Sequence, residues 1–473
     1  MVYTPKLPTG LLEELLSAAL GRGAEMADIY AEQSGYTSVI SDDRKINTSA
    51  RQEGGVGIRV VSNQHTYYAV AASDNPKELL ALAMQVADAA EAGDPCESPV
   101  TLNGRPSPLG PQFVRELTEI GAGERLETVR ANEELAWSGE ERVRQVSIRY
   151  SDHQRDVQIA SSHTSEVIEH TLGLTEYSAA IYAGADGDLQ MGTFGRAVYG
   201  GPEEFKGDDS FEEVTLRARR NALHALDADE APRGVMPVVF EPGENGVLFH
   251  EACGHGMEAD LVERGSAFAG KMGEPVASEL VTLIDDGTIP HAPGSYGVDD
   301  EGVAAKKTTM IREGVLESYL HSIVTASREG VEPTGSARRQ DYRYPPIPRM
   351  RNTYIDQGDT PAADIIAQTE RGLFAQEMGW GGQVDVVTGR FTTGVQLAWL
   401  IENGKLVRPV KGATLSGVGI ETLKNIDMVG DDLDVVRCSG RCGKGQAVPI
   451  GVGMPTVRVS ALLVGGSGEA VQQ

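Results

Sequence analysis

Two histidines and a glutamate lie within six residues of this 473-residue chain, which contains only 9 histidines. The segment reads His250-Glu251-Ala252-Cys253-Gly254-His255, an H-E-x-x-x-H pattern one residue longer than the zinc-binding H-E-x-x-H. Imidazole nitrogens bind zinc, and a carboxylate beside them can act as a general base. The pattern indicates hydrolysis by a metal-activated water. The alternative is a buried helix whose histidines only make hydrogen bonds.

The extra residue constrains the backbone between the two histidines. In a regular α-helix, residues i and i+4 are about 40° apart around the axis, whereas residues i and i+5 are about 140° apart. His250 and His255 can share one metal if the helix contains a π-bulge, or if it ends at Gly254 and the chain turns back. Gly254 and Gly256 flank His255 and would permit either distortion.

Two cysteines near the C-terminus offer a third ligand. Cys438 and Cys442 have C-x-x-x-C spacing within residues 437–446. The segment is no phosphate-binding loop, because Gly445 stands where Ser or Thr is required, and no second cysteine pair makes it a zinc knuckle. One thiolate would complete a His2Cys zinc site and leave the fourth position for water. The alternative is that each thiol is a small buried hydrophobe.

The elements that must position these residues are predicted from hydrophobic periodicity. In the second half, a buried strand at 235–240 leads through a helix-start signal at 241–244 into the histidine segment. Residues 391–402 and 448–464 are strand-dense, and Thr360 is expected to cap a helix over 360–373. In the first half we expect helices at 10–21, 75–91, 118–138 and 211–229, and strands at 28–32, 55–61, 67–71, 145–150, 157–161 and 176–182.

These elements predict an α+β fold with two domains. An N-terminal mixed α/β region, residues 1–234, contains a Pro-, Gly- and Ser-rich linker near 93–111. A β-rich, largely antiparallel C-terminal domain, residues 235–473, carries the metal site.

Composition excludes several other classes of protein. Apolar residues make up 40% and charged residues 23%, as in ordinary globular proteins. The net charge of −27 argues against binding to nucleic acid or to an anionic membrane. No apolar run reaches the roughly 18 residues of a spanning helix, and residues 1–6 lack a signal-peptide pattern. Because 4 cysteines suit a reducing compartment, we expect a cytoplasmic location.

The segment from His250 to Asp260 resembles the signature of the TldD/PmbA family of metalloproteases, on its TldD side. Further blocks occur in the order typical of that family and span residues 250–456 almost continuously. The chain departs from the family pattern at Ser336, where we expect Asn. The blocks are Val298–Gly302, Pro333–Arg339, Pro348–Thr353, Gly381–Asp385, Leu400–Lys405, Pro409–Leu415, Cys442–Lys444 and Gly451–Thr456.

The resemblance implies a zinc-dependent peptidase of unfolded or short peptides that works as a dimer. The dimer would be a homodimer, or a heterodimer with a PmbA/TldE-like paralogue that lacks the motif. The resemblance implies that His250, His255 and Cys442 hold one Zn²⁺ per chain, and that Glu251 is the general base. Because all four residues are present, the chain resembles the active subunit. Cys253 and Cys438 are not expected to be ligands.

Two other functions remain open. A non-hydrolytic peptide-binding scaffold would need no metal and would tolerate Glu251→Gln. A redox or structural thiol protein would depend on Cys438 and Cys442. The peptidase is favoured because a structural zinc site has no use for a glutamate between its ligands. In each peptide-binding case we expect an extended peptide along a sheet edge at 380–402 or 448–464.

Three further groups of residues invite a functional interpretation. Asp299-Asp300-Glu301 could bind a cation, although such a cluster is more often a solvated turn. An arginine island between 338 and 351 would pair with local carboxylates or capture the carboxylates of a peptide. Oxyanion donors are not identified by any motif. The candidate donors are Tyr296, His291 and His321, and the arginines are Arg338, Arg339, Arg343, Arg349 and Arg351.

Overall fold

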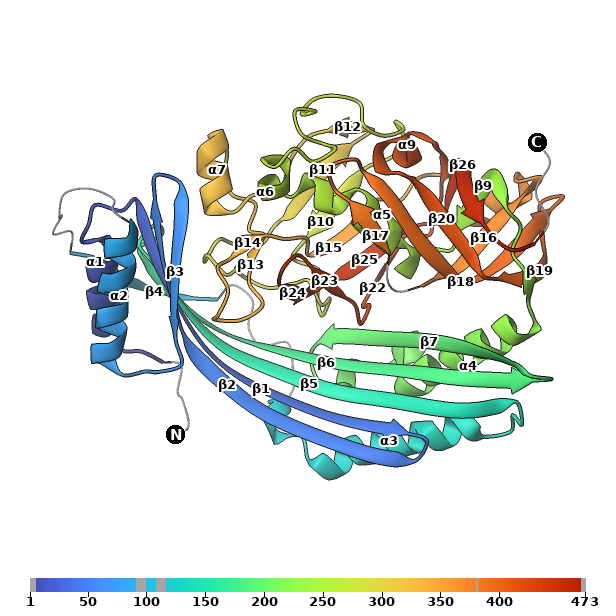
Figure 1. Ribbon diagram of the computed structural model, residues 1–473, viewed down its shortest axis with the longest axis horizontal. Coiled ribbons are helices and arrows are strands. Elements are labelled where there is room, and N and C mark those ends of the chain that lie inside the picture. The colour runs from blue at the N-terminus through green and yellow to red at the C-terminus, as the bar shows by residue number, and fades with distance from the viewer. Residues whose placement is uncertain (1–5, 91–98, 108–115, 380–381, 469–473) are drawn as a thin grey trace.

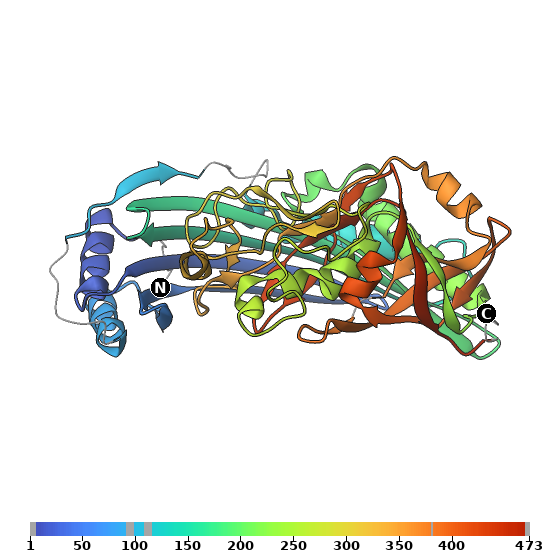
Figure 2. The same ribbon diagram turned by 90° about the horizontal axis from the view of Figure 1, so that it is seen from above.

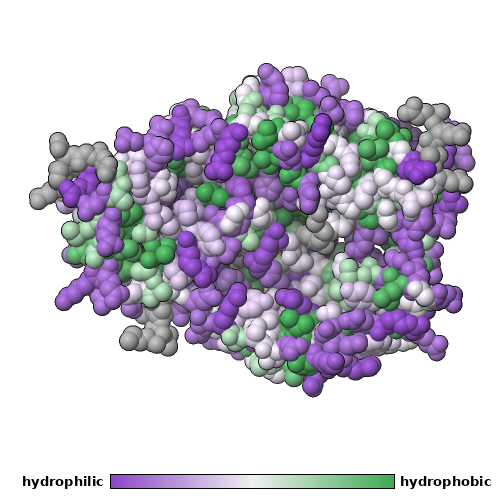
Figure 3. All heavy atoms as spheres, viewed as in Figure 1, coloured by the Kyte–Doolittle hydropathy of each residue, from purple (hydrophilic) through white to green (hydrophobic). Residues whose placement is uncertain are grey.

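The structure is a computed structural model that describes residues 6–90, 99–107, 116–379 and 382–468. A long curved sheet forms the lower layer in Figure 1, and a strand-rich body lies above it. Within these ranges no helix combines the length and the apolar character needed to cross a membrane. The visible face is largely hydrophilic, in keeping with the net charge of −27 (Figure 3).

The lower layer is one seven-stranded sheet with the order β3-β2-β1-β5-β6-β4, and β7 also pairs with β6. Its neighbours are antiparallel, except that β4 runs parallel to β6. Its strands run along the length of the molecule (Figures 1 and 2). They are β1 (Met26–Asp42), β2 (Lys45–Ser62), β3 (His65–Ala71), β4 (Asn103–Pro106), β5 (Val143–Ser161), β6 (Glu166–Ala185) and β7 (Asp188–Tyr199).

Two predictions in this region need correction. The strands expected at 145–150 and 157–161 are one strand, β5, because the polar residues between them stay in register with β1 and β6. Ser151, His153 and Arg155 face the body of the protein, as described below. On the opposite face, Asp152 and Gln154 accept hydrogen bonds from Arg125 Nε and the Leu117 amide, so the polar residues do not end the strand. Residues 93–98 and 108–111 of the predicted linker lie outside the described residues, and the described part, 99–107, contains β4.

Four helices cover this sheet. α1 (Thr9–Leu20) and α2 (Pro76–Ala90) pack through leucines and alanines on β1 and β2, at one end of the molecule (Figure 2). α3 (Ala122–Trp137) and α4 (Phe211–Asp227) bury Val129 and Val214 against the face of β5 and β6 that carries Val146 and Ile148. The opposite face of β5 and β6 is therefore free to meet the second half of the chain.

The second half contains a closed ring of strands. β16 pairs with both β9 and β18, so that β16, β9, β26, β20 and β18 form a ring around an apolar core. β8, β17, β19 and β21 extend it. The bounds are β8 (Asp229–Glu230), β9 (Gly234–Phe240), β16 (Arg371–Met378), β17 (Gln383–Asp385), β18 (Arg390–Glu402), β19 (Lys405–Lys411), β20 (Ala413–Val418), β21 (Ile426–Val429) and β26 (Val457–Gly465).

A six-stranded sheet and two hairpins complete the body. The sheet has the order β12-β11-β10-β15-β25-β22, and the hairpins are β13–β14 and β23–β24. Most strand pairs among the described residues are antiparallel, which confirms the predicted fold class. The bounds are β10 (Leu283–Asp286), β11 (Lys307–Arg312), β12 (Val315–Leu316), β13 (Ala337–Arg338), β14 (Ile347–Pro348), β15 (Asn352–Ile355), β22 (Asp434–Val436), β23 (Arg441–Gly443), β24 (Ala447–Pro449) and β25 (Gly451–Met454).

The helix predicted over 360–373 is too long. The structure has a six-residue helix, α8 (Ala362–Ala367), which has no side-chain cap, and Arg371 already begins β16. The apolar residue Leu373 faces Val238 of β9 in the sheet instead of extending a helical face. The remaining short helices are α5 (Val247–Ala252), α6 (Ala259–Val262), α7 (Ile323–Glu329) and α9 (Gly419–Lys424).

A buried ion network joins the lower sheet to the body. Arg59 of β2 pairs with Asp28 of β1 and, through Nη1, with Glu301 Oε1 at 2.7 Å. Arg339 reaches Asp28 from the body, with 3.4 Å between Nη2 and Oδ1. The segment Asp299–Glu301 is therefore no solvated turn, because its side chains are buried among these partners. The division of the chain into domains at residue 234 stays a prediction.

Candidate metal centre

The chain breaks its helix between the two histidines. α5 ends at Ala252, Cys253 leaves helical geometry with φ −131° and ψ −47°, and residues 254–257 form a 3-10 turn. Of the two predicted geometries, the chain thus adopts the one in which the helix ends, two residues before Gly254. The rings of His250 and His255 come to 5.3 Å between centroids, with their planes 82° apart.

The two glycines beside His255 serve packing and not backbone strain. Neither is among the residues with positive φ. A Cβ at Gly254 would lie 2.0 Å from the Met350 sulfur, and a Cβ at Gly256 would lie 2.7 Å from the Phe268 ring. The sequence correctly indicates that these glycines are special, but the physical reason differs from the predicted one, because it is the close approach of neighbouring side chains.

Cys442 reaches the histidines from the β23–β24 hairpin. One ligand atom from each of His250, His255 and Cys442 lies within 4.8 Å of the others, and the Cys442 Sγ is 3.2 Å from His255 Nε2. All three side chains are buried. The structure thus brings together residues that are 187 positions apart in sequence.

The donor set fits a metal ion. Both ring nitrogens of His250 lack a hydrogen-bond partner although the residue is completely buried. Such a group is costly to bury, by about 1–3 kcal/mol, unless something binds it. Two imidazoles and a thiolate form one of the tetrahedral ligand sets that zinc favours. At Zn–N distances of about 2.0 Å and a Zn–S distance of about 2.3 Å, ligand atoms lie about 3–4 Å apart. The 3.2 Å between Cys442 Sγ and His255 Nε2 falls in this range.

The electrostatics of the cluster favour a thiolate. Burial alone would raise the pKa of the Cys442 thiol, but the adjacent His250 and His255 outweigh it and hold this pKa well below its usual value. Burial would likewise lower the pKa of His255, but Glu258 and Cys442 raise it well above the usual value. Without a metal, both pKa shifts favour the imidazolium form of His255 and the thiolate form of Cys442.

A buried carboxylate that sequence reasoning missed orients His255. Glu258 is completely buried, and its Oε2 lies 2.9 Å from His255 Nδ1 and 3.1 Å from Lys444 Nζ. Burial opposes its charge, but Lys444 and His255 lower its pKa to about 2. A carboxylate at Nδ1 leaves Nε2 free to bind a metal. The sequence feature that could have identified this residue is its position three residues after His255, which places both side chains on the same side of a helical turn.

Glu251 is the member of the motif that reaches solvent. Its side chain is 29% exposed, and its Oε2 lies 3.9 Å from His255 Nε2. A Cβ at Gly382 would lie 3.8 Å from Glu251 Cγ, which places the start of β17 beside this carboxylate. Among the strands that the structure describes, β17 pairs with β18 alone, so its other edge has no strand partner.

Two further cysteines in the described part of the chain have the properties of inert thiols. Cys253 and Cys438 are buried and free. Burial raises the pKa of Cys438 to about 12, and it raises the pKa of Cys253 still further above its usual value. Cys438 Sγ donates to the Ile450 carbonyl at 3.1 Å. A redox function built on Cys438 would need its thiolate, which this environment disfavours.

The predicted oxyanion donors have partners of their own. The Tyr296 hydroxyl donates to the Gly335 carbonyl, His291 Nδ1 lies 2.9 Å from the Tyr199 carbonyl, and His321 Nε2 lies 3.8 Å from Glu329. Nothing in the described structure places them beside Glu251, and no oxyanion role is assigned to them.

The arginine island divides into two groups. Three of the arginines pair with carboxylates, which is one of the two predicted alternatives. They are Arg339, Arg343 and Arg351. Arg338 instead hydrogen-bonds backbone carbonyl groups, and Arg349 combines two such bonds with a longer contact, 3.8 Å from its Nε to Glu258 Oε1. Arg349 holds the Cys442 carbonyl at 2.6 Å and so fixes the backbone of the thiol ligand candidate.

Comparison with known proteins places this site in a family context. Residues 233–466 match the PmbA/TldA metallopeptidase C-terminal domain, and residues 27–90 match the PmbA/TldA metallopeptidase domain 1. A metalloprotease TldD homologue from Haemophilus influenzae is 35% identical over 98% of both chains. A metalloprotease from Methanocaldococcus jannaschii is 40% identical over 68% of this chain and 70% of its own.

Solved structures share the fold. TldE from Thermococcus kodakarensis superimposes with a TM-score of 0.75 at 20% identity, covering 96% of this chain and 100% of its own. A protein from Thermotoga maritima described as a putative modulator of DNA gyrase gives a TM-score of 0.76 at 21% identity, covering 96% and 99%.

Proposed function

Because this chain belongs to the PmbA/TldD family of metallopeptidases, we propose that it is a zinc-dependent peptidase in which His250, His255 and Cys442 hold one zinc ion. The observation that carries the assignment is the buried His2Cys cluster, in which His250 has no other partner for its ring nitrogens. When bound there, zinc would polarise the scissile carbonyl and lower the pKa of a coordinated water toward ~7.

Glu251 supplies the proton transfers in this proposal. Its carboxylate is partly exposed next to the cluster, so it can accept a proton from the attacking water. It then delivers the proton to the nitrogen of the leaving amine. Glu258 and Lys444 act at the other side of His255, where they hold the imidazole in the tautomer whose Nε2 faces Cys442.

The peptide is proposed to bind in extended form along the open edge of β17. Backbone hydrogen bonds to a strand edge give affinity without strong dependence on sequence. The start of β17 lies beside Glu251, so a peptide paired there would pass the proposed base. Unfolded or short peptides fit such a site, because a folded protein cannot offer a free strand. We also propose dimeric assembly, with a second copy or with a TldE-like paralogue.

Metal analysis of the purified chain tests the ligand set. We expect close to one zinc per chain in the wild-type protein and well below one in Cys442→Ser. Cys438→Ser is the matched control, since it removes a second buried thiol four residues away and should keep the zinc. Full zinc occupancy in Cys442→Ser would show that the third ligand is wrong.

Cleavage of a quenched fluorescent peptide tests the base. Glu251→Gln keeps the shape of the side chain but cannot take a proton, so turnover should fall by about 10²–10⁴ with zinc retained. Near-wild-type cleavage by the zinc-loaded variant would defeat the mechanism. Peptide binding without any turnover by the wild-type chain would favour the scaffold function.

A further inference from the structure

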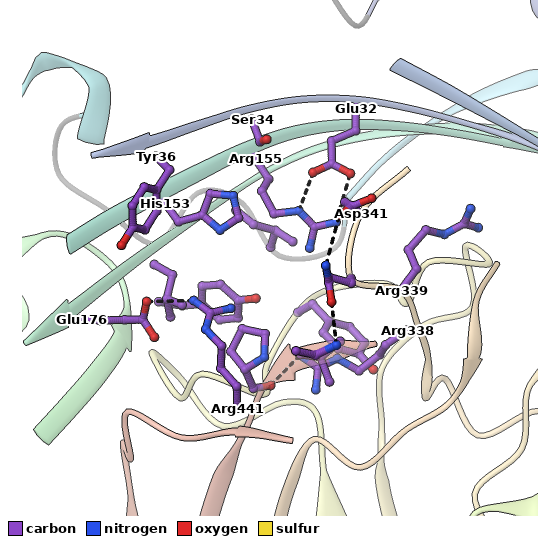
Figure 4. A pocket seen from close by; sticks show the side chains of 18 of the residues that line it. Glu32, Ser34, Tyr36, His153, Arg155, Glu176, Arg338, Arg339, Asp341 and Arg441 are labelled. Atoms are coloured by element: carbon purple, nitrogen blue, oxygen red, sulfur yellow. Dashed lines mark hydrogen bonds and ion pairs between the residues drawn. The ribbon is translucent and has the colours of Figure 1, made fainter. Parts of the chain in front are cut away.

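A cavity separates the middle of the lower sheet from the body. Its volume is about 730 Å³, and Ser151, His153 and Arg155 of β5 line it on the sheet side. Figure 4 shows His153 and Arg155 reaching in from the sheet, and Arg441 reaching in from the body. Direct contacts between the two layers therefore lie around this cavity. The ion network of Asp28 is one such contact, and the outer edge of β7 is another.

The outer edge of β7 contacts the segment that leads to Cys442. Along its other edge β7 pairs with β6, whereas on the outer edge Arg196 forms an antiparallel bridge with Cys438 of the body. The Ala197 amide donates to the Arg437 carbonyl at 2.8 Å. The backbone of the lower sheet thus holds the chain four residues before the proposed thiolate ligand.

The hairpin that carries Cys442 depends on such contacts. Among the described strands, β23 and β24 pair only with each other, and an isolated two-stranded hairpin is marginally stable in water. Contacts from outside the hairpin therefore decide where Cys442 lies. Arg349 supplies one from the body. Glu176 of β6 supplies another from the lower sheet, with 2.8 Å between its Oε2 and Arg441 Nη2 (Figure 4).

The guanidinium of Arg196 reaches the other part of the proposed zinc site. Its Nη1 lies 2.9 Å from Glu244 Oε2, and its Nε lies 2.6 Å from Asp209 Oδ1. Glu244 begins the 3-10 turn that runs directly into α5, the helix that carries His250 and Glu251. Asp209 instead belongs to the lower layer, just before α4. Because Arg196 is only 5% exposed, solvent ions screen these pairs little.

We propose that Arg196 is a positioning residue for the proposed zinc site. Its backbone holds the segment before Cys442, and its side chain holds the start of the helix that carries His250. A metal requires these two segments, which are far apart in sequence, to keep a fixed separation. One buried residue of the lower sheet contacts both. The consequence for zinc rests on the proposed function, whereas the contacts themselves do not.

Hydrogen exchange of the full-length, zinc-free chain tests the positioning without a metal. Glu244→Ala removes the carboxylate that ties the start of α5 to Arg196. Amides of residues 247–255 should then exchange at least about fivefold faster than in the wild-type chain, because local opening of α5 costs less free energy. Asp209→Ala is the matched control, since it takes a carboxylate from the same guanidinium within the lower layer. Its exchange over 247–255 should stay within about twofold of wild type.

Zinc affinity and the spectrum of the cobalt-substituted chain test the consequence for the metal. Arg196→Met keeps the length of the side chain and removes its charge. Zinc affinity should fall about tenfold in Arg196→Met and in Glu244→Ala, the low end of the loss for groups that orient metal ligands, and stay within about threefold in Asp209→Ala. The thiolate-to-cobalt charge-transfer band should change in the first two variants alone. Ion pairs with a merely structural role would lower stability to urea in all three variants and leave this band unchanged.

Equal effects of Glu244→Ala and Asp209→Ala on exchange and on zinc affinity would overturn the proposal. Should Arg196→Met fail to fold, Glu244→Ala decides, because it leaves the backbone bridge of β7 in place. A chain that binds no zinc but shows the expected exchange would refute the proposed function and keep the positioning of α5 by Arg196. A chain that binds zinc and cleaves peptides, with unchanged exchange, affinity and spectrum in Glu244→Ala, would do the reverse.

Discussion

Replacing Glu258 with glutamine should weaken zinc binding without touching a proposed ligand. The carboxylate lies 2.9 Å from His255 Nδ1, 3.1 Å from Lys444 Nζ and 3.8 Å from Arg349 Nε, and all of it is buried. Glutamine has the same shape, but it carries no charge to balance the cations of Lys444 and Arg349. It can also present its amide to Nδ1 as a donor, which would favour the wrong tautomer of His255.

The size of the effect follows from the electrostatics of Glu258. Its pKa of about 2 lies about 2.5 units below the ordinary 4.5, in spite of burial. At 1.36 kcal/mol per unit, its surroundings favour the charged form by about 3 kcal/mol. Lys444 keeps Asp260 as a partner at 2.8 Å, so the variant should lose only about 3 kcal/mol of folding free energy. This is the low end of the range for breaking a buried ion pair. Zinc affinity should fall about 10–100-fold.

Competition with a fluorescent zinc chelator measures the affinity, and urea unfolding of the zinc-free chain measures the stability. Asp260→Asn is the matched control, because it takes a carboxylate from the same Lys444 but makes no contact with His255. We expect its zinc affinity to stay within about threefold of wild type. A Glu258→Gln chain that binds zinc as tightly as wild type would refute the orienting role of Glu258.

Three further predictions concern packing, protonation and thiol reactivity. Gly254→Ala, whose Cβ would meet a sulfur at 2.0 Å, should cost about 1–3 kcal/mol in urea unfolding, whereas Gly123→Ala, with open space around it, should not destabilise. Burial lowers the pKa of His170 to about 4. As the pH falls below about 6.5, the histidine is protonated in the unfolded chain before it is protonated in the folded chain, and this destabilises the folded wild-type protein. His170→Phe should therefore be more stable than wild type by about 3 kcal/mol at pH 4, with no such gain at pH 7. Iodoacetamide at pH 8 should leave Cys253 and Cys438 unmodified in the native chain, and mass spectrometry after unfolding should find both reactive.

The sequence predicts the components of the candidate site better than their arrangement. Residue types and the family resemblance identify His250, His255 and Cys442, and the structure brings them together. The periodicity leaves two geometries open, and only the structure shows that the helix ends at Ala252 and that Met350 and Phe268 pack against the two glycines. Local patterns do not report contacts between segments about a hundred residues apart.

The long strand β5 shows a second limit of sequence reasoning. Its alternation predicts half-exposed strands, since polar side chains usually face solvent. Here Ser151, His153 and Arg155 face a cavity inside the protein, and the register with β1 continues through them. Helix α8 is shorter than predicted, because Leu373 pairs with Val238 in the sheet although the sequence pattern around it is helical. In both cases distant partners decide the outcome.

The ion network between Asp28, Arg59, Glu301 and Arg339 has a consequence for synthesis on the ribosome. Arg59 pairs with a residue 242 positions later in the chain, and Asp28 pairs with one 311 positions later. The N-terminal sheet therefore emerges long before the groups that complete its charges. Until residue 339 has been made, the Asp28–Arg59 pair of the nascent sheet lacks its later partners on a face destined for burial, and that face must stay hydrated. Final docking of the two layers becomes a late event in translation.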